Sequence, residues 1–224
     1  MSVLPTIAET IVAAMRRLEA TGLNRASSGN CSVRDGNTFW ITPSGVSTSD
    51  LQANAIVPVG LDGQPLSRPP HDPTTRRLAP SSEWRFHRDL YAHRPELQAV
   101  VHTHSPFATS LACLHRDIPA FHYMIAVAGG NTIRCAPYAL FGTQDLSDYA
   151  LTAMQDRKAC LLANHGMIAA GSSLDDAMRV AIEVESLCEQ YWRTLQIGAP
   201  HLLSEAQMAE VMEKFKTYGP RHDT

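Results

Sequence analysis

The sequence lacks any long hydrophobic run, since no stretch approaches the roughly 20 apolar residues that a membrane-spanning helix needs. Its N-terminal sequence, MSVLPTIAET, lacks the basic start and the apolar centre of a signal peptide. It also lacks a strong charge of one sign, because 19 Lys and Arg stand against 22 Asp and Glu, for a formal net charge of −3. We therefore expect a cytoplasmic protein that binds neither membranes nor nucleic acid and that holds any anionic ligand locally.

Paired cysteines are also lacking. The five cysteines are odd in number, widely scattered and never spaced C-x-x-C, which argues against a disulfide framework and against a thiolate metal site. We expect them to be small buried hydrophobic residues. They are Cys31, Cys113, Cys135, Cys160 and Cys188.

The composition is that of a folded domain. With 44% hydrophobic and 18% charged residues, the chain has enough apolar surface to exclude intrinsic disorder. Its 224 residues contain no internal repeat and no segment that resembles an interdomain linker. We therefore predict a single α/β domain over residues 1–224.

The hydrophobic pattern of the N-terminal third predicts a helix, a hairpin and an irregular segment. Apolar residues at helical spacing predict an amphipathic helix from about Pro5 to Ala20. Residues 29–41 alternate around Asp35-Gly36-Asn37 and predict two short strands. The prolines and mixed charges of residues 61–80 predict a surface excursion without regular structure.

The rest of the chain alternates strands and helices. Ser81 and Ser82 are good N-cap candidates for a helix that ends before Arg94-Pro95, which puts Glu83 in its first turn. Further strands are expected over residues 97–102, 159–163 and 167–170, with helices over residues 106–114 and 174–195 and a last one from about Ser204.

Three histidines form the first candidate site. His102 and His104 lie two residues apart at the end of a predicted strand, so both imidazoles point to the same face. His165 ends another predicted strand, and strand ends are where α/β proteins collect their sites. Three imidazoles suit a catalytic Zn²⁺ that keeps one open position. The alternative from spacing alone is that these histidines are structural.

A zinc site of this kind needs a proton carrier, for which Glu83 is the candidate. The alternative is that Glu83 is only stabilised by the dipole of its helix.

A phosphate could be held by small polar residues, which occur as Ser27-Ser28-Gly29-Asn30, Thr42-Pro43-Ser44-Gly45 and Ser81-Ser82. Taken singly, each of these segments is more typical of a turn or an N-cap than of a phosphate site.

The segments PSSEWRFH, VVHTH, HYMIAVAGG, CAPYALFGT, ANHG and EKFKTYG together resemble the zinc-dependent class II aldolases of the fuculose-phosphate aldolase type. The resemblance runs from the first helix to the C-terminal tail. It implies a central antiparallel sheet flanked by helix layers and a cyclic homotetramer with active sites at subunit boundaries.

The resemblance also implies a role for each matching residue. The zinc ligands would be His102, His104 and His165, and the catalytic glutamate would be Glu83. Tyr123 would reach a neighbouring subunit's site and protonate the aldehyde oxygen. Phe141 and Tyr218 would handle the aldehyde. The phosphate would be held by Ser27, Asn30, Ser44, Gly45, Ser81 and Ser82.

The implied reaction is the reversible cleavage of a ketose 1-phosphate, with L-fuculose 1-phosphate giving dihydroxyacetone phosphate and L-lactaldehyde. Three departures from the family pattern affect substrate identity: serines at positions 27 and 44 where this type has threonine, Thr103 between the first two histidines, and a long segment 61–80. The alternatives are a methylthioribulose-phosphate dehydratase or a ribulose-phosphate epimerase on the same scaffold. An adducin-like module without catalysis is the alternative from another class.

Overall fold

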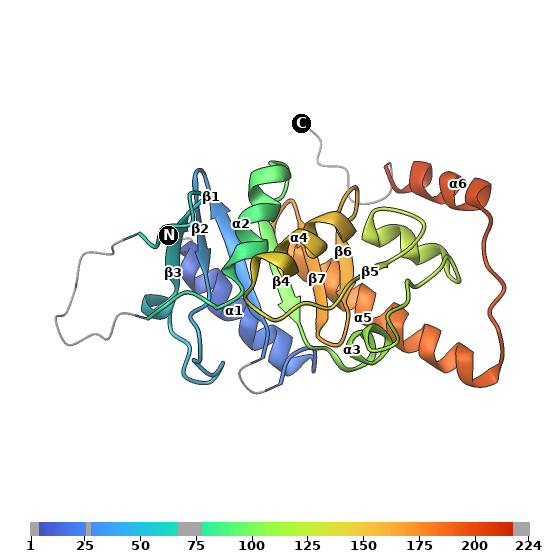
Figure 1. Ribbon diagram of the computed structural model, residues 1–224, viewed down its shortest axis with the longest axis horizontal. Helices are drawn as coiled ribbons and strands as arrows, with labels where there is room; N and C mark the ends of the chain where they lie inside the picture. The colour runs from blue at the N-terminus through green and yellow to red at the C-terminus, as the bar shows by residue number, and fades with distance from the viewer. Residues whose placement is uncertain (1–4, 26–27, 67–77, 217–224) are drawn as a thin grey trace.

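The computed structural model describes residues 5–25, 28–66 and 78–216. Its strands are β1 (Asn30–Asp35), β2 (Thr38–Ile41), β3 (Val57–Gly60), β4 (Ala99–Thr103), β5 (Arg134–Ala136), β6 (Ala159–Leu162) and β7 (Gly166–Gly171). They form one central sheet in the order β3-β2-β1-β4-β7-β6-β5 (Figure 1). Every neighbouring pair is antiparallel except β5 and β6, which confirms the predicted antiparallel sheet.

Helices cover both faces of this sheet (Figure 1). They are α1 (Ile7–Ala20), α2 (Trp84–His93), α3 (Pro106–Ala112), α4 (Gln144–Ala153), α5 (Leu174–Ile197) and α6 (Glu205–Phe215), with the 3₁₀ turns η1 (Ala53–Ala55) and η2 (Tyr123–Ala128). One hydrophobic core joins α1, α3 and α5 to the sheet, and a second core joins α2 and α4 to the opposite face. The result is a single α/β domain with helix layers on both sides, as predicted.

Burial on both faces explains why the central strands are apolar throughout. In β4, Ala99 and Val101 lie in the core with α5, whereas Val100 lies in the core with α2. This period of two continues along the strand, so His102 lies on the α2 side of the sheet and contacts the Phe86 ring edge-on. Burying each large aliphatic side chain contributes about 1.5–3 kcal/mol, and every residue of β4 is buried, so the strand that carries His102 is held on both faces.

Most predicted elements are present, and their ends have local causes. Thr6 caps α1 with a capping box to Glu9, and Ser204 caps α6 with Gln207 in the same way. The hairpin β1–β2 turns at Gly36, which has a φ of 61°. The helix after Pro106 ends at Ala112, so the prediction that it includes Leu114 is wrong, and Leu114 is exposed.

The start of α2 also differs from the prediction. Glu83 is the N-cap residue, in a non-helical conformation, so it is wrong that Ser81 and Ser82 cap this helix and that Glu83 lies in its first turn. The Ser81 hydroxyl instead accepts a long contact of 3.4 Å from the Glu83 N–H. The cysteine prediction holds for three of the five, because Cys113 is exposed and Cys135 is half-buried.

Residues 61–66 and 78–80 contain no helix or strand, as predicted for the excursion, whose remaining residues 67–77 lie outside the described part. The sequence pattern did not predict β3, β5 or α4. Within the described ranges, no helix combines the length and the apolar character needed to cross a membrane.

Candidate active site

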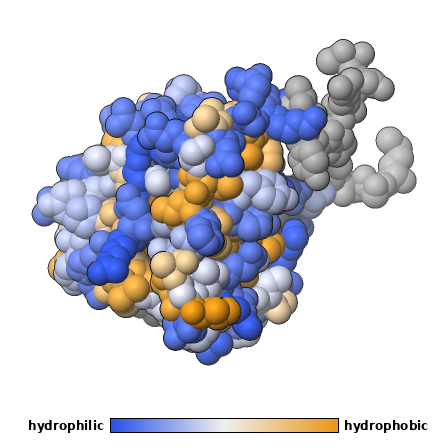
Figure 2. Space-filling view, turned by 90° about the vertical axis from the view of Figure 1, so that its right-hand side faces the viewer, coloured by the Kyte–Doolittle hydropathy of each residue, from blue (hydrophilic) through white to orange (hydrophobic). Residues whose placement is uncertain are grey.

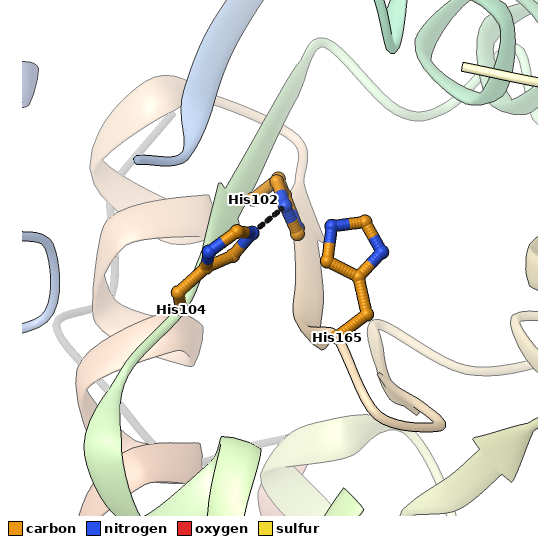
Figure 3. A group of neighbouring side chains, drawn as sticks. All are labelled: His102, His104 and His165. Atoms are coloured by element: carbon orange, nitrogen blue, oxygen red, sulfur yellow. Dashed lines mark hydrogen bonds between the residues drawn. The ribbon is translucent and has the colours of Figure 1, made fainter. Parts of the chain in front are cut away.

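The three histidines come together where β4 ends beside the turn between β6 and β7. In the register of the sheet, His102 of β4 lies opposite Ile168 of β7, and His104 follows just after the strand. His165 lies in the tight turn from β6 to β7, next to Asn164, which has a φ of 54°. The three rings face one common point (Figure 3), with ring centroids 4.8 to 4.9 Å apart.

The hydrogen bonds of His102 define which of its nitrogens is free. Its Nδ1 lies 2.9 Å from the Met167 carbonyl oxygen, which can only accept, so Nδ1 carries the proton. Nε2 therefore presents a lone pair, and it lies 3.0 Å from Nε2 of His104. Burial lowers the pKa of His102 to about 4 and also lowers the pKa of His104, so both rings are neutral at pH 7.

This donor set fits a divalent metal. One ligand nitrogen from each histidine lies within 4.8 Å of the others. Tetrahedral Zn²⁺ with bonds of about 2.0–2.1 Å holds its ligand nitrogens about 3.3 Å apart, close to the separation of the His102 and His104 nitrogens. Neutral imidazoles are the ligands that zinc accepts.

The Glu83 carboxylate faces the same space. Its Oε2 lies 3.3 Å from Nε2 of His102, and its Oε1 lies 3.2 Å from Nε2 of His165. Oε1 is buried and makes no hydrogen bond of ordinary geometry to any described residue, which is the situation of an oxygen that faces a cation.

The position of Glu83 also determines its protonation state. Burial raises the pKa of the Glu83 carboxyl, but the adjacent His102 and His165 rings and the hydrogen bond from the Asn30 amide outweigh it and hold the pKa below its usual range. The carboxyl is therefore ionised and able to accept a proton.

Two of the small polar segments meet beside Glu83. The Ser44 N–H donates to the Ala79 carbonyl, and the Ser81 N–H donates to the Thr42 carbonyl, so residues 42–44 and 79–81 run side by side. Ser44, Gly45 and Ser82 are exposed at this junction, whereas Ser81 is buried. The structure thus brings together four of the residues predicted to hold phosphate.

The other two phosphate candidates have different positions. Asn30 begins β1, directly opposite His102 in the register, and its side-chain amide donates to Glu83 Oε2 at 2.8 Å. Its side chain therefore contacts the glutamate. Ser27 lies outside the described residues.

The residues predicted to act on the aldehyde are dispersed. Phe141 is 61% exposed and lines a surface cavity together with Ser82 and Gly142, next to the segment that carries Glu83. Tyr123, in η2, is half exposed, and its ring packs with His122 and Phe215 at centroid distances of 4.8 and 6.5 Å. No ring contact, hydrogen bond or ion pair joins Tyr123 to His102, His104 or His165 within the described residues. Tyr218 lies outside those residues.

Sequence reasoning missed Glu185, which holds the segment after His104. The carboxylate of this α5 residue accepts hydrogen bonds from the Phe107 and Ala108 N–H groups and from the Ser105 hydroxyl, at 2.7 to 2.8 Å. It therefore caps the N-terminus of α3 from a distant part of the chain. An acidic residue on the packed face of an amphipathic helix was the available signal.

Comparisons with known proteins agree with this fold and site. The family model described as Class II Aldolase and Adducin N-terminal domain matches residues 9–192. The chain therefore belongs to the class II aldolase and adducin family.

Its named relatives are aldolases. The chain is 54% identical over 209 residues to the 5-methylthioribulose-1-phosphate/5-deoxyribulose-1-phosphate aldolase of Rhodospirillum rubrum, covering 93% of this chain and 90% of that protein. It is 44% identical over 216 residues to the L-fuculose phosphate aldolase of Escherichia coli K12, covering 96% of both. A solved L-fuculose 1-phosphate aldolase superposes with a TM-score of 0.88 at 35% identity, covering 96% of this chain and 98% of the other. The protein is thus an enzyme of the class II aldolase type.

Proposed function

We propose that the protein is a zinc-dependent aldolase that cleaves a ketose 1-phosphate into dihydroxyacetone phosphate and an aldehyde. The observation that carries this proposal is the ionised Glu83 carboxylate facing three convergent imidazoles, His102, His104 and His165. A histidine cluster alone is compatible with many roles. A buried base beside a metal site is suited to removing a proton from the carbon next to a carbonyl group, or to returning it.

When bound, the zinc ion polarises the carbonyl of the ketose and stabilises the negative charge that bond cleavage leaves on the dihydroxyacetone phosphate half. In the synthetic direction, Glu83 accepts a proton from dihydroxyacetone phosphate, and in the cleavage direction it returns that proton. The exposed hydroxyls and N–H groups at residues 42–45 and 81–82, together with Ser27 and Asn30, would hold the phosphate. Tyr123, from a neighbouring subunit, would exchange the proton of the aldehyde oxygen, with Phe141 and Tyr218 on the aldehyde side.

We propose a 5-deoxypentulose 1-phosphate as the preferred substrate, because the relative at 54% identity acts on 5-methylthioribulose 1-phosphate and 5-deoxyribulose 1-phosphate. Cleavage between C3 and C4 would release a two-carbon aldehyde, with or without a methylthio group. L-fuculose 1-phosphate, expected from the sequence resemblance, is the competing substrate and would release L-lactaldehyde, which carries an additional hydroxyl that needs a polar partner.

A comparison of kcat/KM on the three sugar phosphates tests this proposal, with both products identified. We expect dihydroxyacetone phosphate from each active substrate and the highest kcat/KM with a 5-deoxypentulose 1-phosphate. A higher value with L-fuculose 1-phosphate would reverse the substrate assignment. Water loss without dihydroxyacetone phosphate would indicate a dehydratase, and C4 epimerisation would indicate an epimerase.

We also propose a homotetramer with sites at subunit boundaries, in the cytoplasm. The large apolar side chains exposed near α6 and the C-terminal half of α5 favour such an assembly, and Figure 2 shows apolar residues interrupting the polar surface at this end of the molecule. They include Tyr123, Trp192, Leu195, Ile197 and Leu202. Retention of a complete histidine and glutamate site argues against an adducin-like module without catalysis.

A further inference from the structure

A chain of buried polar side chains runs from Glu83 away from the histidines, through the core between β1 and α2. The Asn30 amide donates to Glu83 Oε2 at 2.8 Å, and Asn30 Oδ1 lies 2.6 Å from Nε2 of His87. Nδ1 of His87 lies 2.7 Å from the Ser32 hydroxyl, which lies 2.7 Å from the Tyr91 hydroxyl. Asn30, Ser32, His87 and Tyr91 are each no more than 3% exposed.

Each link of this chain has only one direction. The Asn30 NH₂ group donates to Glu83 Oε2, which leaves Oδ1 as the Asn30 atom that faces His87. Oδ1 only accepts, so Nε2 of His87 carries the proton. Nδ1 of His87 then has a lone pair and accepts from the Ser32 hydroxyl. The Tyr91 hydroxyl ends the chain and shares its proton between the hydroxyl and the carbonyl oxygen of Ser32.

The opposite arrangement would turn the Asn30 carbonyl oxygen toward the Glu83 carboxylate. Two acceptors at 2.8 Å would repel each other in a buried place where no water screens them. The Nε2–H form of His87 is therefore what keeps the Asn30 amide turned toward the glutamate. His87 follows Glu83 by four residues, so both side chains leave the same side of the α2 segment.

We propose that His87 is a positioning residue, which fixes the orientation of Asn30 and through it the direction of the Glu83 carboxylate. The inference rests on the proposed role of Glu83 as the base. His87 itself contacts neither the substrate nor the metal. It determines how closely Glu83 is held to the proton that it transfers.

The first test needs no activity. In long-range ¹H–¹⁵N spectra of histidine-labelled wild-type protein, the His87 ring, identified by its loss in His87→Gln, should show the neutral pattern with the proton on Nε2. A proton on Nδ1, or on both nitrogens, would overturn the inference.

The second test uses two variants of similar size and polarity. Gln at position 87 reaches as far as Nε2 and still donates to Asn30, whereas Asn reaches only as far as Nδ1 and does not. We expect His87→Asn to lower kcat by about 10–100-fold, with KM and zinc content unchanged, and His87→Gln to recover most of that loss. Equal losses in both variants, or a loss confined to KM, would contradict the positioning role.

These outcomes are separable from a failure of the proposed function. If wild-type protein cleaves none of the three sugar phosphates, the proposed substrate class is wrong. The spectrum of the His87 ring still decides whether the hydrogen-bond chain exists.

Discussion

The substitution Gly166→Ala tests the site by adding a single methyl group. A Cβ at Gly166 would lie 2.3 Å from the Thr103 carbonyl oxygen, 3.0 Å from Cδ2 of His104 and 3.3 Å from Cε1 of His102. The nearest of these atoms is main chain in β4, paired to β7, so it cannot rotate away. Carbon and oxygen in such contacts stay about 3.3–3.6 Å apart, so the strands must separate by about 1 Å.

This displacement has two consequences. Overpacking of a buried site costs about 1–3 kcal/mol in the free energy of unfolding. The residue that moves, Thr103, lies between His102 and His104, and metal–ligand distances tolerate changes of about 0.2 Å. We therefore expect zinc affinity to fall by about 10–100-fold or more, the usual range for disturbed support of a metal ligand.

Denaturant titration of the zinc-free protein and competition with a chelator measure the two effects separately. The matched control is Gly198→Ala, which adds the same methyl group where no atom lies within 4 Å and where the backbone is extended. We expect this control to stay within about 0.5 kcal/mol of wild type, with unchanged zinc affinity. If Gly166→Ala behaves like Gly198→Ala in both measurements, the close packing of the β6–β7 turn on the histidines is refuted.

Three further predictions concern the chemistry, the assembly and the pH dependence. Glu83→Gln should lower turnover by about 10²-fold or more with a native circular dichroism spectrum, because glutamine keeps the shape of the side chain and is not a base. Near-normal turnover would show that Glu83 is not the catalytic base. Reassembled mixtures of Glu83→Gln and Tyr123→Phe subunits should exceed both parents in activity if Tyr123 acts across a subunit boundary, and mixed assemblies without recovery would contradict this. The free energy of unfolding of the zinc-free protein should fall as the pH decreases from 7 to 5. Burial lowers the pKa of His102 to about 4 and that of His87 to about 3, so in this range only the unfolded chain, with an ordinary histidine pKa of 6.5, takes up these protons. A flat profile in denaturant titrations would contradict this.

The histidine site could be predicted from sequence because its geometry is local. His102 and His104 share a face through the period of a strand, and His165 follows a short apolar run typical of a buried strand. Strand β7, which lies between β4 and β6 and pairs with both, then brings the rings together. The central strands and the long helices were predictable for the same reason, because the spacing of their apolar residues shows which face is buried.

The missed strands are both at the edges of the sheet. β3 contains Pro58 and β5 spans three residues, so neither has a periodic signal, and an edge strand is where a proline is tolerated. The helix α4 buries Ala150 and Ser147 beside Leu146, and such small residues give a weak hydrophobic pattern.

The position of Glu83 depends on contacts between distant segments. Pairing of residues 42–44 with residues 79–81 decides where α2 begins, and no local pattern reports that pairing. As a result Glu83 leaves the helix and faces the histidines. The sequence does place His87 four residues after Glu83, on the same side of the helix. That His87 acts on Glu83 follows only from its hydrogen bonds to the buried residues Asn30 and Ser32, which the sequence does not show.

Hydrogen exchange in dihydroxyacetone phosphate, without any aldehyde, isolates the proton transfer by Glu83 from the rest of the reaction. The zinc-loaded enzyme in D₂O should replace one of the two C3 hydrogens with deuterium, as followed by proton NMR, whichever aldehyde it prefers. We expect this exchange to be about 10²-fold or more slower in Glu83→Gln, because the carboxylate is the base. No exchange in the wild-type enzyme, or equal rates in the two proteins, would contradict the assignment of Glu83 and the histidines as the aldolase site.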